Sequence, residues 1–189
     1  MVTWARTPST MRRANFFLDL LILGSALALV VVATSWYPLL PERFVIHLNG
    51  TGKPNGWAPR HPLAWSLLPG VGLVLALLIR VAARWVEDAG ARSPANFNMP
   101  DQPRFIALDI DARRTALAPT ALFLRYTATL ILLLFMYIIE GVGRLSTQQV
   151  ASWSSWPVFI FVGLILGGLP WLFGRTRRAI AAGHSAQYR

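Results

Sequence analysis

The chain has 189 residues, of which 54% are hydrophobic and only 14% are charged, and its formal net charge is +10. A soluble domain carries about a quarter charged residues, and a disordered chain has low hydrophobicity, so both classes are excluded. The chain contains no cysteine, which also excludes disulfides, thiolate metal sites and cysteine nucleophiles. An integral membrane protein is the class that remains.

Four apolar runs are long enough to cross a membrane, because a spanning helix needs about 20 mainly apolar residues. The sequence therefore predicts an all-α protein with four transmembrane helices in a single domain, residues 1–189. The first run follows the basic pair Arg12–Arg13, as a signal peptide would. It exceeds the usual apolar core of about 7–15 residues and no small-x-small cleavage site follows, so we interpret it as a retained anchor. The four runs are residues 16–36, 63–86, 121–142 and 156–173.

The basic residues favour one orientation in the membrane. Thirteen of them fall beside the termini and the loop 87–119, and four fall on the other side of the predicted spans. Cytoplasmic loops carry an excess of Lys and Arg, so we expect both termini and the loop 87–119 in the cytoplasm, and the loop 37–62 outside. The expected location is the cell (inner or plasma) membrane. The thirteen are Arg6, Arg12, Arg13, Arg80, Arg84, Arg92, Arg104, Arg113, Arg114, Arg175, Arg177, Arg178 and Arg189, and the four are Arg43, Lys53, Arg60 and Arg144.

Apart from Arg80 and Arg84, which we expect to extend to the cytoplasmic interface, three charged residues lie within the predicted spans. A charge inside the bilayer costs at least a few kcal/mol, so each of them needs a partner or a route to water. Asp19 and Arg125 enter their spans from the same side at similar depth, which predicts a structural ion pair. Glu140 has Arg144 four residues further along the same helix, which predicts a second pair. The alternative is a proton or ion relay.

The loop 37–62 has the pattern of a compact, ordered structure. Phe44–Ile46 combines aromatic and β-branched residues and is typical of extended chain. The dipeptides Asn49-Gly50 and Asn55-Gly56 are strong turn formers, so we expect two turns in the loop.

Two chemical interpretations of this loop deserve a test. Gly50–Lys53 superficially resembles a phosphate-binding P-loop, but that motif requires glycine at the position of His47, so we reject it. His47, His61 and Glu42 are candidate metal ligands, because imidazole and carboxylate suit zinc. Their spacing matches no standard ligand pattern, so neither a metal nor a cofactor is expected.

The same loop resembles the signature of a bacterial membrane-protein family, the domain of unknown function 1648. The signature has a proline, a His-x-Asn, a glycine and an Asp-Gly-Trp-like turn between the first two helices, and related proteins include the immunity protein against the sporulation-delaying toxin. Leu48 stands where an aromatic residue is usual, and Asn55 where Asp is frequent. Asn96–Pro100 and Phe105–Leu108 are also similar to short members of the family. The resemblance implies that the loop binds a ligand through Pro41, His47, Asn49, Gly52, Gly56 and Trp57.

The cytoplasmic loop 87–119 is expected to be irregular in its first part and helical from Arg104 to Thr115. Asp109 and Arg113 would form an i,i+4 pair on that short helix. We expect the helix to lie on the inner leaflet and the loop to offer a docking site for a cytoplasmic regulator. The membrane-facing residues of this helix would be Ile106, Ile110 and Leu117.

These observations predict a non-catalytic integral membrane protein whose outer loop recognises an extracytoplasmic peptide or protein, for toxin immunity or for signalling. The alternative is a subunit, small transporter or membrane enzyme that uses His47, His61 and Glu42 at the outer face. Nucleic acid is not an expected partner, because the arginines follow the positive-inside pattern. The lipid bilayer is an expected partner, and a homo-oligomer is an open alternative. Gly163 and Gly167 form a small-residue face that would let another helix approach closely.

Overall fold

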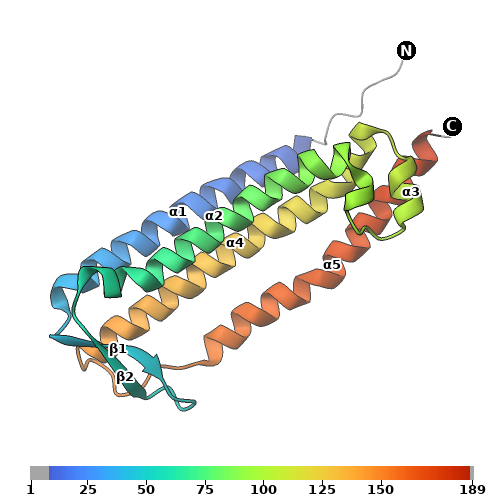
Figure 1. The fold of residues 1–189 in the computed structure, drawn as a ribbon. Helices are drawn as coiled ribbons and strands as arrows, with labels where there is room; N and C mark the ends of the chain where they lie inside the picture. The colour runs from blue at the N-terminus through green and yellow to red at the C-terminus, as the bar shows by residue number, and fades with distance from the viewer. Residues whose placement is uncertain (1–8, 188–189) are drawn as a thin grey trace. The chain divides into compact units, whose positions relative to one another are not determined.

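The computed structural model describes residues 9–187, so Arg6, Arg189 and the side chain of Arg12 lie outside the described part. Within this range the protein is mostly helical, and four of its helices are long and apolar enough to cross a membrane. The prediction of four such helices is confirmed. Each is longer than its predicted apolar run, because the helix continues into flanking polar residues. They are α1 (Ser9–Trp36), α2 (Pro62–Arg92), α4 (Ile110–Ser146) and α5 (Trp156–Gln187) (Figure 1).

The chain divides into two compact units, and each boundary between them falls inside a long helix. The first unit comprises the described residues up to Leu20, Leu78–Thr127 and the described residues from Ile165 onward. The second comprises Leu21–Leu77 and Ala128–Leu164. The second unit therefore contains the connection between α1 and α2 and the connection between α4 and α5.

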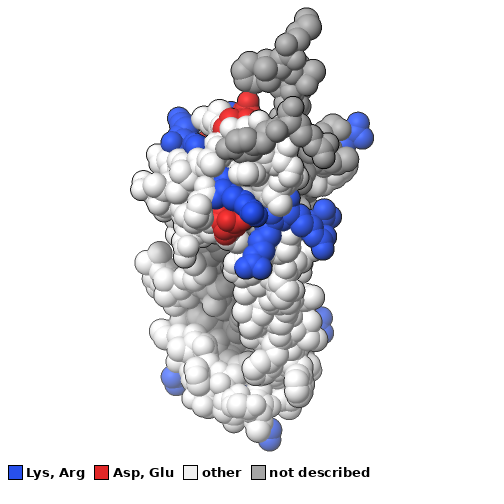
Figure 2. All heavy atoms as spheres, turned by 90° about the vertical axis from the view of Figure 1, so that its right-hand side faces the viewer, with Lys and Arg blue, Asp and Glu red and all other residues white. Residues whose placement is uncertain are grey.

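The long helices expose many large apolar side chains, as helices in contact with lipid do. Leu67 on α2 and Phe159 on α5 are 68% and 64% exposed, and no residue of the most apolar stretch of α5 is buried. Figure 2 shows the same property on one face, where Lys and Arg gather in one area together with a few acidic side chains, and large areas carry no charge. The exposed surface therefore fits a multi-pass membrane protein.

The connection between α1 and α2 folds into an antiparallel hairpin of β1 (Arg43–Leu48) and β2 (Pro54–Pro59), preceded by the short 3₁₀ helix η1 (Tyr37–Leu39). The turn expected at Asn49-Gly50 is present between the strands. The turn expected at Asn55-Gly56 is absent, because both residues lie inside β2, opposite an irregularity in β1. A Cβ on Gly56 would lie 2.9 Å from the His47 Cβ, so glycine here permits close approach of the strands rather than a turn.

The connection between α2 and α4 differs from the predicted single helix over 104–115. It contains the 3₁₀ helix η2 (Pro94–Asn96) and the short helix α3 (Gln102–Ala107), and α4 starts anew at Ile110. Asp109 ends the connection, because its Oδ1 accepts hydrogen bonds from the N–H of Asp111 and Ala112 at 3.0 and 2.8 Å. Aspartate is a strong N-cap residue, and this capping separates the two helices.

Arg113 does not form the predicted pair with Asp109. Its guanidinium instead donates to the carbonyl oxygens of Ala91 and Ile106, at 3.1 and 2.6 Å. Leu117 is fully buried and does not share an exposed face with Ile106, so the expected membrane-facing stripe is not formed. The connection packs into a core of its own within the first unit, formed by Ala91, Phe105, Leu108, Ala116, Leu117 and Ile180.

Candidate functional site

The turn of the hairpin is held by the side chain of Asn49. Its Oδ1 accepts hydrogen bonds from the N–H of Thr51 and Lys53 at 3.0 and 2.9 Å, and from the Thr51 hydroxyl at 2.8 Å. Gly52 follows with φ of +75°, a left-handed conformation that glycine adopts without strain. Asn49 and Gly52, two of the predicted ligand-binding residues, therefore shape the turn.

The connection between α4 and α5 is attached to this turn through Trp153. The Trp153 N–H donates to the Gly52 carbonyl at 2.9 Å, and a Cβ on Gly52 would collide with the Trp153 carbonyl oxygen. The Trp153 ring packs against Tyr137, with 5.0 Å between ring centroids, and covers Gly141 of α4. Tyr137 also donates its hydroxyl hydrogen to the Ser154 carbonyl at 2.7 Å. Gly52 and Gly141, far apart in the sequence, therefore both contact Trp153, and a side chain at either position would collide with it.

Aromatic side chains hold the body of the hairpin on the helices. Phe44 is buried in β1, and its ring meets the Trp65 ring edge-on with 5.4 Å between centroids. Trp65 of α2 donates its indole N–H to the Ala33 carbonyl of α1 at 2.8 Å. At the open end of the hairpin, Arg60, which follows β2, donates to the carbonyl of Leu40, which precedes β1, at 2.7 Å. The hairpin is therefore fixed to the last residues of α1 and the first turn of α2.

The end of α4 is held by a polar contact with the end of α1. Trp36 donates its indole N–H to Glu140 Oε2 at 2.8 Å, and its ring lies over Gly143. Arg144 Nε lies 2.6 Å from Glu140 Oε1, so this carboxylate accepts hydrogen bonds from both side chains. These contacts position the residues that follow Arg144, where α4 ends.

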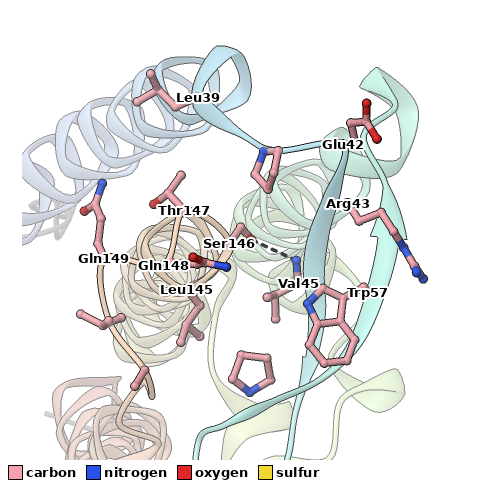
Figure 3. A pocket seen from close by; sticks show the side chains of 14 residues that line it. Leu39, Glu42, Arg43, Val45, Trp57, Leu145, Ser146, Thr147, Gln148 and Gln149 are labelled. Atoms are coloured by element: carbon pink, nitrogen blue, oxygen red, sulfur yellow. Dashed lines mark hydrogen bonds between the residues drawn. The ribbon is translucent and has the colours of Figure 1, made fainter.

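A groove of about 1200 Å³ lies between the hairpin and the segment that leaves α4. We call it the hairpin groove (Figure 3). Ser146 joins its two walls, because its hydroxyl accepts a hydrogen bond from the Val45 N–H at 2.9 Å. Gln148 stands in the left-handed region with φ of +59° as the chain leaves the helix. The groove is lined by Leu39, Pro41, Glu42, Arg43, Val45, Pro54, Trp57, Leu145, Ser146, Thr147, Gln148, Gln149, Val150 and Ala151.

The structure brings only part of the predicted ligand-binding set to this groove. Pro41 and Trp57 line it, and Trp57 is 48% exposed. His47 instead lines a separate cavity of about 590 Å³ with mainly apolar walls, formed by the hairpin, α2 and α4. The second wall of the groove, residues 145–151, was not predicted, because it has no motif and lies about 90 residues further along the chain than the hairpin.

The candidate metal ligands are not brought together. His47 Nδ1 lies 2.5 Å from Asn55 Oδ1, and His61 Nδ1 accepts a hydrogen bond from the Leu63 N–H at 3.3 Å. Within residues 9–187, no three His, Asp or Glu side chains are close enough to hold a metal ion together. His47, His61 and Glu42 therefore form no ligand set in the described structure.

The ion pair expected between Asp19 and Arg125 is part of a larger network of charged residues in the first unit. Arg125 Nε lies 3.3 Å from Asp19 Oδ1, and Arg125 Nη2 lies 3.4 Å from Glu87 Oε2. Arg80 makes the shorter contacts with Asp19, since its Nε and Nη2 lie 2.6 and 2.7 Å from the two carboxylate oxygens. Asn15 donates to Glu87 at 3.5 Å. Two arginines and two carboxylates balance each other here, and the sequence had suggested only one member of each kind.

Residues 23–73 match the model of a protein family described as a domain of unknown function (DUF1648). The matched region runs from within α1 through the hairpin to within α2, so it includes one wall of the hairpin groove. Residues 145–151, which form the other wall, lie outside it. No curated protein and no solved structure matches the chain significantly.

Proposed function

We propose that this chain is a non-catalytic protein of the cell membrane that recognises an extracytoplasmic peptide or protein in the hairpin groove. The observation that carries the proposal is the groove itself, whose two walls come from distant parts of the chain and are joined by the Val45–Ser146 hydrogen bond. Its volume exceeds the range of about 300–1000 Å³ that is usual for small-molecule pockets, which favours a larger ligand.

The proposed orientation puts both termini and the α2–α4 connection in the cytoplasm and the hairpin outside. The distribution of Lys and Arg supports it, because thirteen of them lie beside the termini and that connection, against four near the hairpin and the end of α4. With this orientation the hairpin groove faces the extracytoplasmic space, and a secreted ligand has access to it.

The chemistry of the groove supports binding rather than catalysis. Its polar lining consists of carboxamide, hydroxyl, carboxylate and guanidinium groups, which hydrogen-bond to a ligand in water-accessible surroundings. The Ser146 hydroxyl accepts from the backbone N–H of Val45, and no histidine lines the groove to act as its base. Toxin immunity and inward signalling are the two outcomes of recognition that we propose.

Photo-crosslinking in living cells tests this function. Trp57 is replaced by benzoylphenylalanine, which keeps an aromatic ring in the groove, and Lys53 is replaced likewise as an exposed control outside the groove. We expect position 57, and not position 53, to capture an extracytoplasmic polypeptide, and an excess of the same polypeptide in unlabelled form to prevent the capture. Capture of lipid alone from position 57 would contradict the proposal.

A further inference from the structure

We propose that the ligand of the hairpin groove is an extended peptide segment whose main chain pairs with Arg43 at the exposed start of the β1 edge. The inference rests on the proposed function and adds to it how the ligand binds. Strand addition to an exposed sheet edge supplies affinity through main-chain hydrogen bonds, and side-chain pockets then supply selectivity.

The hydrogen bonds of the hairpin identify which backbone groups lie on that edge. The Arg60 N–H donates to the Glu42 carbonyl at 2.7 Å, so Glu42 directs its main-chain groups toward the second strand. Neighbouring residues of a strand direct these groups to opposite sides, so Arg43 and Val45 direct theirs away from β2. The bond from the Val45 N–H to Ser146 lies on that side and agrees with this assignment.

The partner residues in β2 support the same alternation. Arg43 stands opposite Pro59, which has no N–H to offer, so this pair is suited to a position without ladder hydrogen bonds. The edge of β1 thus presents the N–H and the carbonyl of Arg43, which is exposed. The accessible part of the edge ends at Val45, which is 1% exposed and whose N–H already donates to Ser146.

The hairpin groove runs beside this edge. Within the strand it is lined by Arg43 and Val45 and not by Phe44, whose ring packs on Trp65 beneath the hairpin. Facing the strand, Gln148 is exposed and carries a carboxamide that both donates and accepts hydrogen bonds. Figure 3 shows the Gln148 side chain directed toward β1. An extended main chain would therefore meet hydrogen-bonding groups on both sides.

The paired part of the ligand is short. The register of the hairpin is irregular after Val45, so the edge keeps a regular direction only over the first residues of β1. The two available groups of Arg43 correspond to two hydrogen bonds, which one ligand residue supplies in an antiparallel pair, since only alternate residues of a strand face the same edge.

Peptide selection followed by backbone methylation tests the inference. A random twelve-residue peptide library is displayed on phage and selected on the full chain in lipid nanodiscs. Selected peptides are kept if a Gln149→Trp variant, which fills the groove, loses them and a Lys53→Trp control outside the groove retains them. Synthetic versions are then N-methylated at one residue at a time, and their affinities are measured.

Main-chain pairing with Arg43 predicts one sensitive residue in each peptide. Methylation at that residue should weaken binding about tenfold, because one hydrogen bond is worth roughly 1 kcal/mol and the methyl group also obstructs the edge. Methylation at the residues on either side of it should change little. Groove-dependent peptides that lose affinity at no residue, or equally at neighbouring residues, would overturn the pairing and leave the proposed function standing. Failure to select any groove-dependent peptide would overturn both.

A change in the protein gives an independent measure. Arg43→Pro removes the N–H at the edge without removing a ladder bond, and Arg43→Ala is the matched control for loss of the side chain. We expect the proline variant to bind the selected peptides about five to ten times more weakly than the alanine variant. Equal affinities, with both variants folded, would contradict a hydrogen bond at Arg43. If the proline variant does not fold, the methylation pattern decides the question alone.

Discussion

Arg80 and Asp19 form an ion pair with two parallel hydrogen bonds, 2.6 and 2.7 Å long, between α2 and α1. This fork geometry makes the pair stronger and more specific than the single contact of 3.3 Å that Arg125 makes with the same carboxylate. Arg125 is nonetheless the more buried of the two arginines, with 5% of its side chain exposed against 18% for Arg80. Asp19 therefore compensates two cations whose environments differ.

Asp19→Asn should lower the free energy of unfolding by roughly 1.5–3 kcal/mol, because hydrogen bonds to charged groups are lost and two arginines keep less compensation. Unfolding in mixed detergent micelles measures the change, and Asp88→Asn on an exposed part of α2 is the control. In double-mutant cycles, Arg80→Gln should couple to Asp19→Asn more strongly than Arg125→Gln does. Additive effects for both pairs would contradict the network.

Gly52→Ala should weaken the attachment of the hairpin to the α4–α5 connection. The substitution introduces a side chain at positive φ and directs it into the Trp153 backbone, which together should cost about 1–3 kcal/mol. Gly50→Ala in the same turn is a matched control, since no atom lies within 4 Å of its added Cβ. Hydrogen exchange of residues 147–155 measures the effect, and equal protection in the two variants would disprove the attachment.

Gly141→Ala should destabilise the protein even though alanine favours helices more than glycine does. The added methyl group meets the Trp153 indole, and such overpacking costs roughly 1–3 kcal/mol. Gly167→Ala is the matched control in another long helix, because the space beside Gly167 is open. Thermal unfolding should therefore rank Gly141→Ala below the unsubstituted protein and Gly167→Ala at or above it. The reverse order of unfolding temperatures would mean that the Trp153 indole does not pack against the backbone at Gly141.

The natural lack of cysteine makes the proposed orientation directly testable. A single cysteine at Lys53 should react with a membrane-impermeant thiol reagent in intact cells. A single cysteine at Arg177 should react only after the membrane is permeabilised. The opposite labelling pattern would invert the orientation and remove the extracytoplasmic access that the proposed function needs.

The sequence predicts the helices well because spanning length and hydropathy are local properties. The hairpin was partly predictable, since Phe44–Ile46 and the Asn49-Gly50 turn are local signals. The turn predicted at Asn55-Gly56 was wrong, because the conformation there depends on a contact between strands, the close approach of His47 to Gly56. The pattern around Asp109 was ambiguous, since aspartate can cap a helix as well as lie within one, and capping prevails.

The candidate site was the least predictable part. Arg80 was expected at the membrane interface, and only the packing of α1 against α2 shows that it faces Asp19. Residues 145–151 lack charge and motif, and their contribution depends on where α4 ends relative to β1. Tertiary contacts of this kind leave little signal in a single sequence.

With the proposed function, the Val45–Ser146 hydrogen bond has a consequence for how the choice of ligand can change. One wall of the hairpin groove lies in the region that matches the domain of unknown function, and the other is supplied by a separate stretch after α4. The hairpin can thus serve as a constant frame while the five residues 147–151 are exchanged. Grafting different sequences into that stretch, with Ser146 and Trp153 retained at its borders, should retarget the protein without rebuilding its transmembrane scaffold.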